Sequence, residues 1–164
     1  MMNVLVVYDS QFGNTEQIGR AIANQLETRG IVRLLSVEDP AGHNLIGVDL
    51  LVVGGPTQGH GARQPLRDWV EQLSPTMLRS VGVATFDTRL RWPLFLAGSA
   101  ANSIAKTLKN NGARLLVPPE SFFVEGREGP LTNGELERAG AWADTLIPQH
   151  TTEALPGIPI HSAS

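Results

Sequence analysis

Short uninterrupted runs of apolar residues alternate along this chain with stretches in which apolar residues recur every three or four positions. Runs of the first kind are typical of strands buried on both faces of a sheet, and spacing of the second kind is typical of amphipathic helices. The predicted strands are Val4–Val7, Ile31–Val37, Leu50–Val53, Val81–Phe86 and Leu115–Val117, the last of which has a possible resumption at Phe122–Val124.

Four helices are predicted between and after these strands. We expect them to run from Asn14 or Thr15 to just before Gly30, from Pro65 onward, from about Ser99 to Asn110, and from the capping-box sequence Thr132–Glu135 onward. Their expected inward-facing residues are Ile18, Ala21, Ile22 and Leu26, then Leu66, Trp69, Val70 and Leu73, then Ile104, Ala105 and Leu108, and finally Leu136, Ala139, Ala143, Leu146 and Ile147. Strands and helices in this alternation predict a parallel sheet covered by helices on both faces and joined by right-handed crossovers.

The length of 164 residues and a hydrophobic content of 41% fit one domain with one real core. We expect that domain to span residues 1–147. Residues 148–164 contain three prolines and no periodicity, and we interpret them as a flexible tail. The alternative is that this segment docks on a neighbouring subunit through Leu155, Ile158 and Ile160.

Charge and cysteine content exclude several functions. The formal net charge is −3 without a lysine or arginine stripe, which argues against binding to nucleic acid or to an anionic membrane. The absence of cysteine excludes disulfides and thiolate chemistry, so any redox chemistry has to come from a cofactor. No apolar run is long enough to span a bilayer or resembles a signal peptide, so we expect a cytoplasmic protein.

The segment from Val6 to Ala23 combines a buried strand, a polar turn and an amphipathic helix. The first N–H groups of a helix that begins at Asn14 or Thr15 lack partners within the helix, and Ser10, Asn14 and Thr15 add side-chain donors there. This arrangement predicts a phosphate site. The turn has neither the spacing of a nucleotide P-loop nor that of a dinucleotide fold, because Gly13 is its only glycine and no lysine follows.

Ligands of such sheets bind at the carboxyl ends of the strands, where the winding direction reverses. Three loops are expected at that edge, at Asp9–Asn14, Gly54–Arg63 and Asp87–Ala97. A phosphoacceptor receiver domain would need an aspartate at the end of the third strand, where this chain has Gly54 and Gly55. A serine hydrolase would need a GxSxG motif, which is absent.

At these loops the chain resembles the flavodoxin family. The sequence DSQFGNT looks like the phosphate loop of that family, with Ser10, Gly13 and Thr15 in matching places and Phe12 where a threonine is usual. The sequence GGPTQGHG from Gly54 to Gly61 resembles the loop that flanks the flavin ring. The resemblance implies a flavodoxin-like three-layer α/β/α sandwich whose five parallel strands have the order 2-1-3-4-5. It also implies FMN as the cofactor, with its phosphate in the first loop and its ring between the second and third.

The resemblance and the three loops together give a set of candidate cofactor-binding residues. These are Ser10, Gln11, Phe12, Gly13, Asn14, Thr15, Pro56, Thr57, Gln58, Gly59, His60, Gly61, Phe86, Asp87, Thr88, Arg89 and Trp92. The chain departs from the electron carriers of the family at the ring, where it has Gln58 in place of a tryptophan and no tyrosine in the third loop. Phe12, Phe86 and Trp92 are the aromatic residues that could compensate, although Phe86 also fits a core position and Trp92 also fits simple loop packing.

Several of these residues have more than one interpretation. Four glycines at positions 54, 55, 59 and 61 are expected to adopt positive φ and let the backbone approach a flat ring. Arg89 and Arg91 are candidates for tuning the flavin potential, for binding a nicotinamide phosphate or an acidic partner, or for plain solvated charges. Asp87 is a candidate acceptor for flavin N3–H or a partner of Arg89. Ser99 is interpreted as a helix-capping residue.

The leading hypothesis is an FMN-binding redox protein that takes electrons from a reductase or a nicotinamide donor and passes them to a protein partner or a small acceptor. The chemistry would belong to the flavin, so we expect neither catalytic side chains nor metal ligands. The same fold also fits an NAD(P)H-dependent quinone reductase, and the missing ring aromatics fit a non-redox module that has lost productive flavin binding. The sequence leaves the oligomeric state open.

Overall fold

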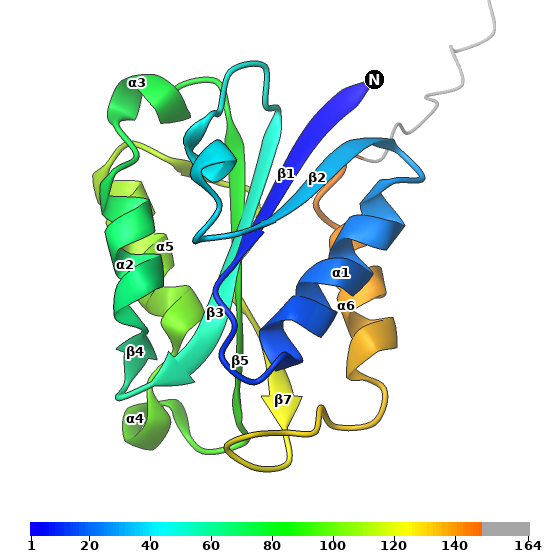
Figure 1. Cartoon of the computed structure of the whole chain (residues 1–164), viewed down its shortest axis with the longest axis vertical. Coiled ribbons are helices and arrows are strands. Elements are labelled where there is room, and N and C mark those ends of the chain that lie inside the picture. The colour runs from blue at the N-terminus through cyan, green and yellow to red at the C-terminus, as the bar shows by residue number, and fades with distance from the viewer. Residues whose placement is uncertain (149–164) are drawn as a thin grey trace, which may run out of the picture.

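The computed structural model describes residues 1–148 and shows three layers, with a central sheet between two pairs of helices (Figure 1). The main strands are β1 (Met2–Tyr8), β2 (Gly30–Ser36), β3 (Leu50–Gln58), β5 (Gly82–Leu90), β6 (Arg114–Leu115) and β7 (Glu120–Val124). The main helices are α1 (Asn14–Leu26), α2 (Gln64–Glu71), α5 (Ala100–Asn110) and α6 (Glu135–Asp144). Shorter elements are η1 (Pro40–His43), β4 (Gly61–Ala62), α3 (Pro75–Leu78) and α4 (Leu94–Ala97).

The sheet is parallel and has the predicted order. Strand β1 lies between β2 and β3, and β5 follows β3. The fifth position is shared by β6 and β7, which both pair with β5. Pro118 and Pro119 separate them, and since proline has no N–H to donate to the ladder, the predicted strand at 115–117 is interrupted and resumes at Glu120. The predicted α/β/α sandwich is confirmed.

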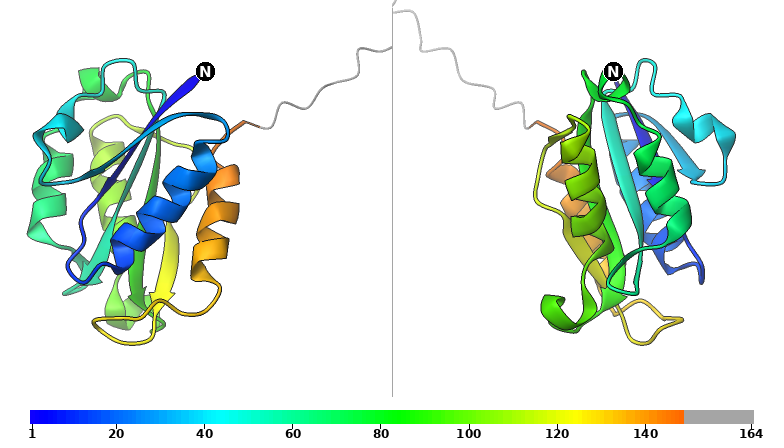
Figure 2. Two further views of the ribbon diagram at one scale, coloured as in Figure 1. Left: turned by 45° about the vertical axis from the view of Figure 1, so that its right-hand side comes forward. Right: turned by 90° about the vertical axis from the view of Figure 1, so that its left-hand side faces the viewer.

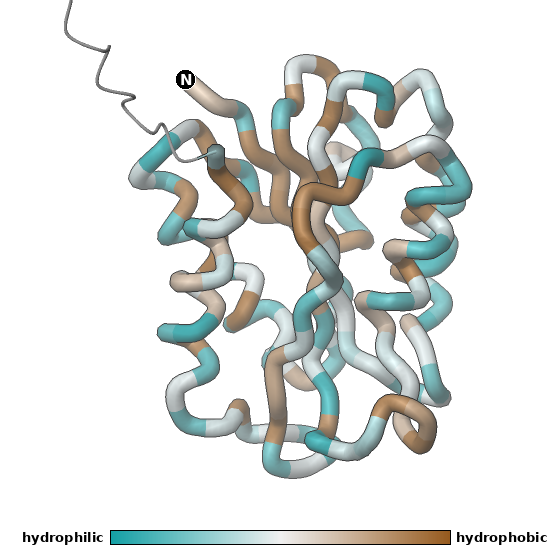
Figure 3. The backbone as a smooth tube through the Cα atoms, turned by 180° about the vertical axis from the view of Figure 1, so that it is seen from behind, coloured by the Kyte–Doolittle hydropathy of each residue, from teal (hydrophilic) through white to brown (hydrophobic). Residues whose placement is uncertain are grey.

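Helices α1 and α6 cover one face of the sheet, and α2 and α5 cover the other, as the rotated views show (Figure 2). Each face has its own buried cluster, because alternate residues of β1 point to opposite sides: Val4 and Val6 to α1 and α6, Leu5 and Val7 to α2 and α5. Hydrophobic residues are concentrated in the central strands (Figure 3).

The fourth predicted helix begins differently from the prediction. The N-cap of α6 is Gly134, with φ of +88° and no side-chain cap hydrogen bond, so the expected capping box at Thr132–Glu135 is wrong. The Glu135 carboxylate instead accepts a hydrogen bond from the Phe123 N–H at 2.8 Å and pairs with Arg138 at 2.6 Å. Leu136 is exposed rather than inward-facing, and Trp142 fills the core against Phe86 and Phe122.

Strands β3 and β5 are longer than predicted. Gly54 and Gly55 belong to β3, and only Gly59 of the four glycines expected to have positive φ adopts it, at +56°. The reason for glycine at the two strand positions is packing: a Cβ on Gly54 would lie 2.3 Å from the Phe86 ring, and one on Gly55 would lie 2.5 Å from Leu66 Cδ2. Gly54 leaves room for a large side chain of the neighbouring strand β5, and Gly55 leaves room for one of helix α2.

No helix within residues 1–148 is long and apolar enough to cross a membrane. The predicted boundary at residue 147 falls three residues after the end of α6 at Asp144. Nearly all of the predicted tail, including Leu155, Ile158 and Ile160, lies outside the described residues.

Candidate functional site

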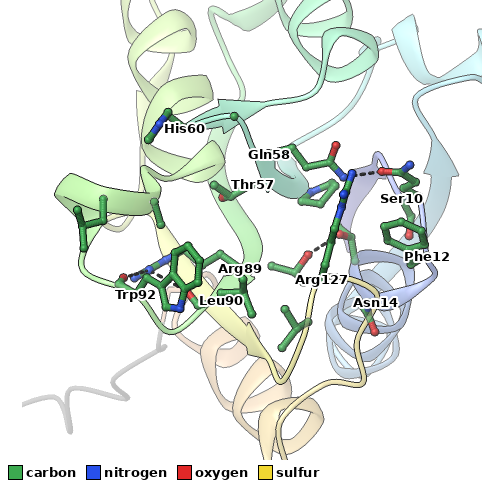
Figure 4. Close-up of a pocket in the computed structure, with 18 residues that line it drawn as sticks. Ser10, Phe12, Asn14, Thr57, Gln58, His60, Arg89, Leu90, Trp92 and Arg127 are labelled. Atoms are coloured by element: carbon green, nitrogen blue, oxygen red, sulfur yellow. Dashed lines mark hydrogen bonds between the residues drawn. The ribbon is translucent and has the colours of Figure 1, made fainter.

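A cavity of about 280 Å³ opens at the carboxyl ends of the strands, where four segments converge (Figure 4). This volume is slightly below the usual range of small-molecule sites, which extends from roughly 300 to 1,000 Å³. Most of the predicted site residues line it together: Ser10, Gln11, Phe12, Asn14, Thr15, Pro56, Thr57, Gln58, Gly59, His60, Thr88, Arg89 and Trp92. Leu90, Leu96, Ala97, Val124 and Arg127 complete the lining.

The first segment is the turn between β1 and α1. Gly13 has φ of +89°, a conformation that glycine adopts without a steric penalty, and its N–H donates to Ser10 Oγ at 3.1 Å. Helix α1 begins at the next residue. Within the described residues, the N–H groups of Asn14 and Thr15 donate to no protein acceptor, so this helix end presents free donors to the cavity.

Side chains of the same turn connect it to two other segments. Thr15 Oγ1 and Thr88 Oγ1 share a buried hydrogen bond of 2.7 Å, and Thr88 comes from β5. Asn14 Nδ2 donates to the carbonyl of Glu128 at 3.1 Å, which fixes the connection between β7 and α6 against α1. The donors at this end of the cavity are therefore held in place by hydrogen bonds between different segments.

The second segment is a hairpin formed by β3 and β4, with Gly59 and His60 at its tip. His60 has φ of +72°, and its carbonyl lies so close to Gly98 that a Cβ there would be 2.1 Å away. Gln58 Nε2 donates to Gln11 Oε1 at 2.5 Å and so joins this hairpin to the first segment. Gly61 belongs to β4 and, like Gly13, is not part of the cavity lining.

Thr57 has a structural partner at the start of helix α5. Its Oγ1 accepts a hydrogen bond from the Ala100 N–H at 2.8 Å, and Ser99 Oγ accepts one from the Asn102 N–H at 3.1 Å. Ser99 is the N-cap of α5, as predicted. The first N–H groups of α5 are thus occupied by protein acceptors, in contrast to those of α1.

Phe86 and Asp87 were predicted to contact the cofactor, and the structure corrects both. Phe86 is fully buried in the core between Phe122 and Trp142, with ring centroids 6.2 Å from each. Asp87 is also fully buried and accepts hydrogen bonds from Ser99 Oγ at 2.5 Å and the Ala101 N–H at 3.0 Å. The sheet pleat is the reason, because β5 continues to Leu90 and turns these side chains into the two core layers.

The third segment comprises the end of β5 and the residues up to Ala97, and its arginines make contacts that hold it in place. Arg89 Nε donates to Ser121 Oγ at 3.0 Å, and its NH1 donates to the carbonyl of Trp92 at 2.8 Å. Both Arg89 and Arg91 lie over the Phe123 ring, at 5.1 and 4.1 Å from its centroid. Arg89 therefore lines the cavity without pairing with Asp87, and Arg91 is not part of the lining.

Aromatic side chains stand at both sides of the cavity. Figure 4 shows Phe12 on the side of the first segment and Trp92 on the opposite side. Their exposed fractions are 40% and 58%, which is high for residues of this size and leaves their faces available to a ligand.

Arg127 was not predicted. It belongs to the connection between β7 and α6, and its side chain extends into the cavity (Figure 4). The sequence around it, Glu125-Gly126-Arg127-Glu128-Gly129-Pro130, follows the last strand at the carboxyl edge, so the same rule that selected the other three loops would have selected it. The prediction overlooked it because the last strand was placed mainly at 115–117.

The charges around the cavity favour an anion. Arg89 and Arg127 are the only charged side chains among the described residues that line it. Asp9 lies just behind the first segment, where burial raises the pKa of its carboxyl although Arg63, 2.8 Å away, lowers it in part. The arrangement can bind an anionic group at the start of α1 and a flat apolar group between Phe12 and Trp92, and it offers no carboxylate in the cavity for acid and base chemistry.

Comparison with known proteins places this geometry in context. The family model described as Flavodoxin matches residues 6–142. Among solved structures, oxidised Flavodoxin 2 from Bacillus cereus has a TM-score of 0.72 at 23% identity, covering 88% of this chain and 97% of that one. A flavodoxin from the domain Archaea has a TM-score of 0.69 at 20% identity, covering 88% and 96%. Rubredoxin oxygen:oxidoreductase from Desulfovibrio gigas has a TM-score of 0.70 at 18% identity, covering 88% of this chain and 35% of that one. No curated protein matches the chain.

Proposed function

The chain belongs to the flavodoxin family, whose cofactor is FMN, and on that premise we propose that the cavity at the carboxyl ends of its strands holds FMN for electron transfer. The observation that supports this most strongly is the pairing of free helix donors with an adjoining aromatic cavity. A ligand that carries both a phosphate and a flat ring could bind the helix donors with its phosphate and the aromatic part of the cavity with its ring. We call these two parts the phosphate half and the ring half.

The proposed phosphate half is the start of α1. The free N–H groups belong to Asn14 and Thr15, which line the cavity at the positive end of the helix dipole, and Ser10 adds a hydroxyl. The Thr15–Thr88 and Asn14–Glu128 hydrogen bonds keep these donors in position before a ligand arrives. Arg127 adds a positive charge on the same side of the cavity as Asn14, since its chain neighbour Glu128 is bonded to Asn14.

The proposed ring half lies between Phe12 and Trp92. Stacking of an aromatic pair contributes about 0.5 to 1.5 kcal/mol beyond burial of its area, so these two side chains can replace part of what the usual tryptophan and tyrosine of the family supply. Gln58, held by Gln11, presents its backbone and that of Gly59 to the edge of the ring.

FMN supplies the redox chemistry, by taking up and releasing electrons at its ring. The chain contributes binding, orientation and charge. Arg89 and Arg127 are the charged side chains that line the cavity among the described residues, and positive charge near a flavin ring favours its anionic reduced form. We therefore propose an electron carrier that delivers electrons to a protein partner or a small acceptor.

The test is to titrate the purified chain with FMN, riboflavin and inorganic phosphate while following flavin fluorescence and thermal unfolding. We expect FMN to bind and to raise the melting temperature, and riboflavin to bind at least tenfold more weakly because it lacks the phosphate. A chain that leaves FMN fluorescence unchanged does not have the proposed function. Stabilisation by phosphate alone to the same extent as by FMN would instead favour a non-redox module.

The quinone reductase alternative is separated by a second measurement. A carrier holding FMN should oxidise NADH or NADPH in the presence of a quinone at a rate close to that of free FMN. Rapid, saturable oxidation of either nucleotide would identify a reductase.

A further inference from the structure

Hydrogen bonds from two different strands meet at the start of α5. The Ala100 N–H donates to Thr57 Oγ1 at 2.8 Å, and Thr57 is near the end of β3. The Ala101 N–H and the Ser99 hydroxyl both donate to Asp87 Oδ2, at 3.0 and 2.5 Å, and Asp87 belongs to β5. One short stretch of chain therefore connects two strands that lead to the cavity.

All hydrogen bonds of the Asp87 side chain within residues 1–148 go to this stretch. The carboxyl group is fully buried, its Oδ1 atom accepts no hydrogen bond from that part of the chain, and no basic side chain there pairs with it. Burial of a carboxylate is costly unless donors or positive charge offset it. Here the offset comes from the Ser99 hydroxyl, the Ala101 N–H and the positive end of the α5 dipole. The Asp87 side chain thus fixes the start of α5 to β5.

Two parts of the cavity wall are attached to the start of α5. Leu96 and Ala97, the last residues of α4, line the cavity, and only Gly98 separates them from the N-cap of α5. The hairpin of β3 and β4 is attached twice, through Thr57 Oγ1 and through a β-bridge between His60 and Gly98. Figure 4 shows Thr57 and His60 on the side of the cavity away from the turn that precedes α1. Both parts of the wall belong to the ring half.

The phosphate half has separate supports. The Thr15–Thr88 and Asn14–Glu128 hydrogen bonds hold it, and neither of them involves α5 or the hairpin. Thr88 directly follows Asp87 in β5, and because side chains alternate along a strand, Thr88 faces α1 whereas Asp87 faces α5. Two consecutive residues of one strand therefore secure the two halves of the cavity from opposite faces of the sheet.

We propose that Asp87 is a positioning residue for the ring half of the cavity. By anchoring the start of α5, it holds the hairpin and the end of α4 in place as part of the wall against which the flavin ring binds. This proposal rests on the proposed FMN function. Asp87 acts through other residues, because its own side chain is not part of the cavity lining. A wall that is already held in place costs less free energy to order when a ligand binds, so the loss of this anchor should weaken binding of the ring.

The test compares FMN with riboflavin on the full chain. Asp87→Ala removes the acceptor of the Ala101 N–H and the Ser99 hydroxyl. We expect the dissociation constants of FMN and riboflavin to rise by the same factor, roughly fivefold or more, because both ligands carry the ring. Fluorescence titrations measure both constants, and their ratio should remain that of the wild type.

A second readout needs no flavin. Hydrogen exchange of the full chain measures how often a backbone amide opens to solvent. In Asp87→Ala, the amides of residues 57–62 and 98–102 should exchange faster than in the wild type, whereas those of residues 10–16 should exchange at the wild-type rate. This pattern would show that the variant releases the ring half and leaves the phosphate half in place.

Thr85→Val is the matched control. It also removes a buried hydrogen bond between β5 and α5, from Thr85 Oγ1 to the Ala101 carbonyl at 3.0 Å, but it leaves the acceptors at the start of the helix in place. It should change neither the flavin affinities nor the exchange of the hairpin. Asp87→Asn keeps an oxygen that can accept both bonds and should bind both flavins within about twofold of the wild type. Ser99→Ala removes the hydroxyl that joins Asp87 to the helix start, and it replaces Asp87→Ala with the same expected direction if that variant does not fold.

Three results would overturn the proposal. One is a wild-type chain that binds FMN together with an Asp87→Ala variant that binds it equally well. Another is a loss of FMN affinity without a loss of riboflavin affinity, which would place the effect at the phosphate half. The third is an equal loss in Thr85→Val, which would assign the effect to the packing of α5 as a whole. A wild-type chain that binds neither flavin refutes the proposed function itself, and the exchange measurement then still shows whether Asp87 anchors the hairpin.

Discussion

The hydroxyl groups of Thr15 and Thr88 lie 2.7 Å apart and share a buried hydrogen bond, although 72 residues separate them in the chain. Thr15 is in the first turn of α1 and Thr88 is near the end of β5, so this bond fixes the proposed phosphate half of the cavity to the strand that leads to its ring half. A ligand that spans both halves depends on their relative position.

Replacing Thr88 with valine, which has nearly the same shape, removes this bond and leaves the Thr15 hydroxyl without its partner. We expect the dissociation constant for FMN to rise about tenfold, which corresponds to roughly 1.4 kcal/mol. Fluorescence titration measures it. Thr85→Val is the matched control, because Thr85 lies on the same strand but bonds to the carbonyl of Ala101 in α5. Equal weakening by both variants would contradict a specific role for the Thr15–Thr88 bond.

Gly54 is required by the packing of Phe86. An alanine Cβ at this position would lie 2.3 Å from the ring, and both Phe86 and the strand around it are fully buried, so neither can move away cheaply. We expect Gly54→Ala to lower the free energy of unfolding by about 2 to 4 kcal/mol, measured by urea denaturation. Gly140→Ala is the control in α6, where the new methyl group meets only Gln25 Oε1 at 3.8 Å. That variant should stabilise the protein by about 0.5 to 1 kcal/mol.

Gly54 and its neighbour Gly55 also show how much of the fold could be predicted from the sequence. The apolar runs and helical periodicity were sufficient for the layers, because burial on both faces requires such runs in a parallel sheet, whereas the strand order came from the resemblance to the flavodoxin family. Glycines 54 and 55 were assigned to a loop, since glycine is more common in loops than in strands. Their place in β3 depends on Phe86 and Leu66, which are distant in sequence and belong to other elements.

Site residues that belong to one local turn could be predicted from the sequence. Site residues whose position depends on several elements were harder to predict. Ser10, Gly13 and the start of α1 were all found from a single turn. Arg127 was missed because it enters the cavity from a connection whose position depends on where the last strand ends. Asp87 was assigned to the cavity because its strand was predicted to end at Phe86, whereas β5 continues to Leu90 and the Asp87 side chain is turned into the core.

Acid should destabilise the protein partly through Glu135. Burial raises the pKa of this carboxyl, but the hydrogen bond from Arg138, the Phe123 N–H and the positive charges nearby lower it by more, so the pKa lies below its ordinary value of 4.5. A carboxyl with a lowered pKa in the folded state contributes stability above pH 4.5 and loses it as the pH falls through the folded value. We expect Glu135→Gln to be less stable than the wild type at pH 7 and to lose less stability between pH 5 and 3.

Urea denaturation at a series of pH values measures this difference. Glu137→Gln is the control, since Glu137 is exposed on the same first turn of α6. Parallel stability profiles for the wild type and Glu135→Gln would show that this carboxyl does not contribute to the pH dependence.

Replacing Arg127 should weaken the binding of FMN and leave the binding of riboflavin unchanged. Its side chain enters the cavity from the connection that Asn14 holds through the carbonyl of Glu128, so the proposed phosphate position at the start of α1 is within its reach. A charged hydrogen bond to a phosphate contributes about 1.5 to 3 kcal/mol, so Arg127→Gln should raise the dissociation constant for FMN by at least tenfold. Riboflavin, which has no phosphate, should bind the variant and the wild type equally well. Fluorescence titrations with both ligands measure this, with Arg114→Gln as the control at an exposed position outside the cavity. An equal loss of affinity for both ligands would place the contribution of Arg127 at the ring instead of the phosphate.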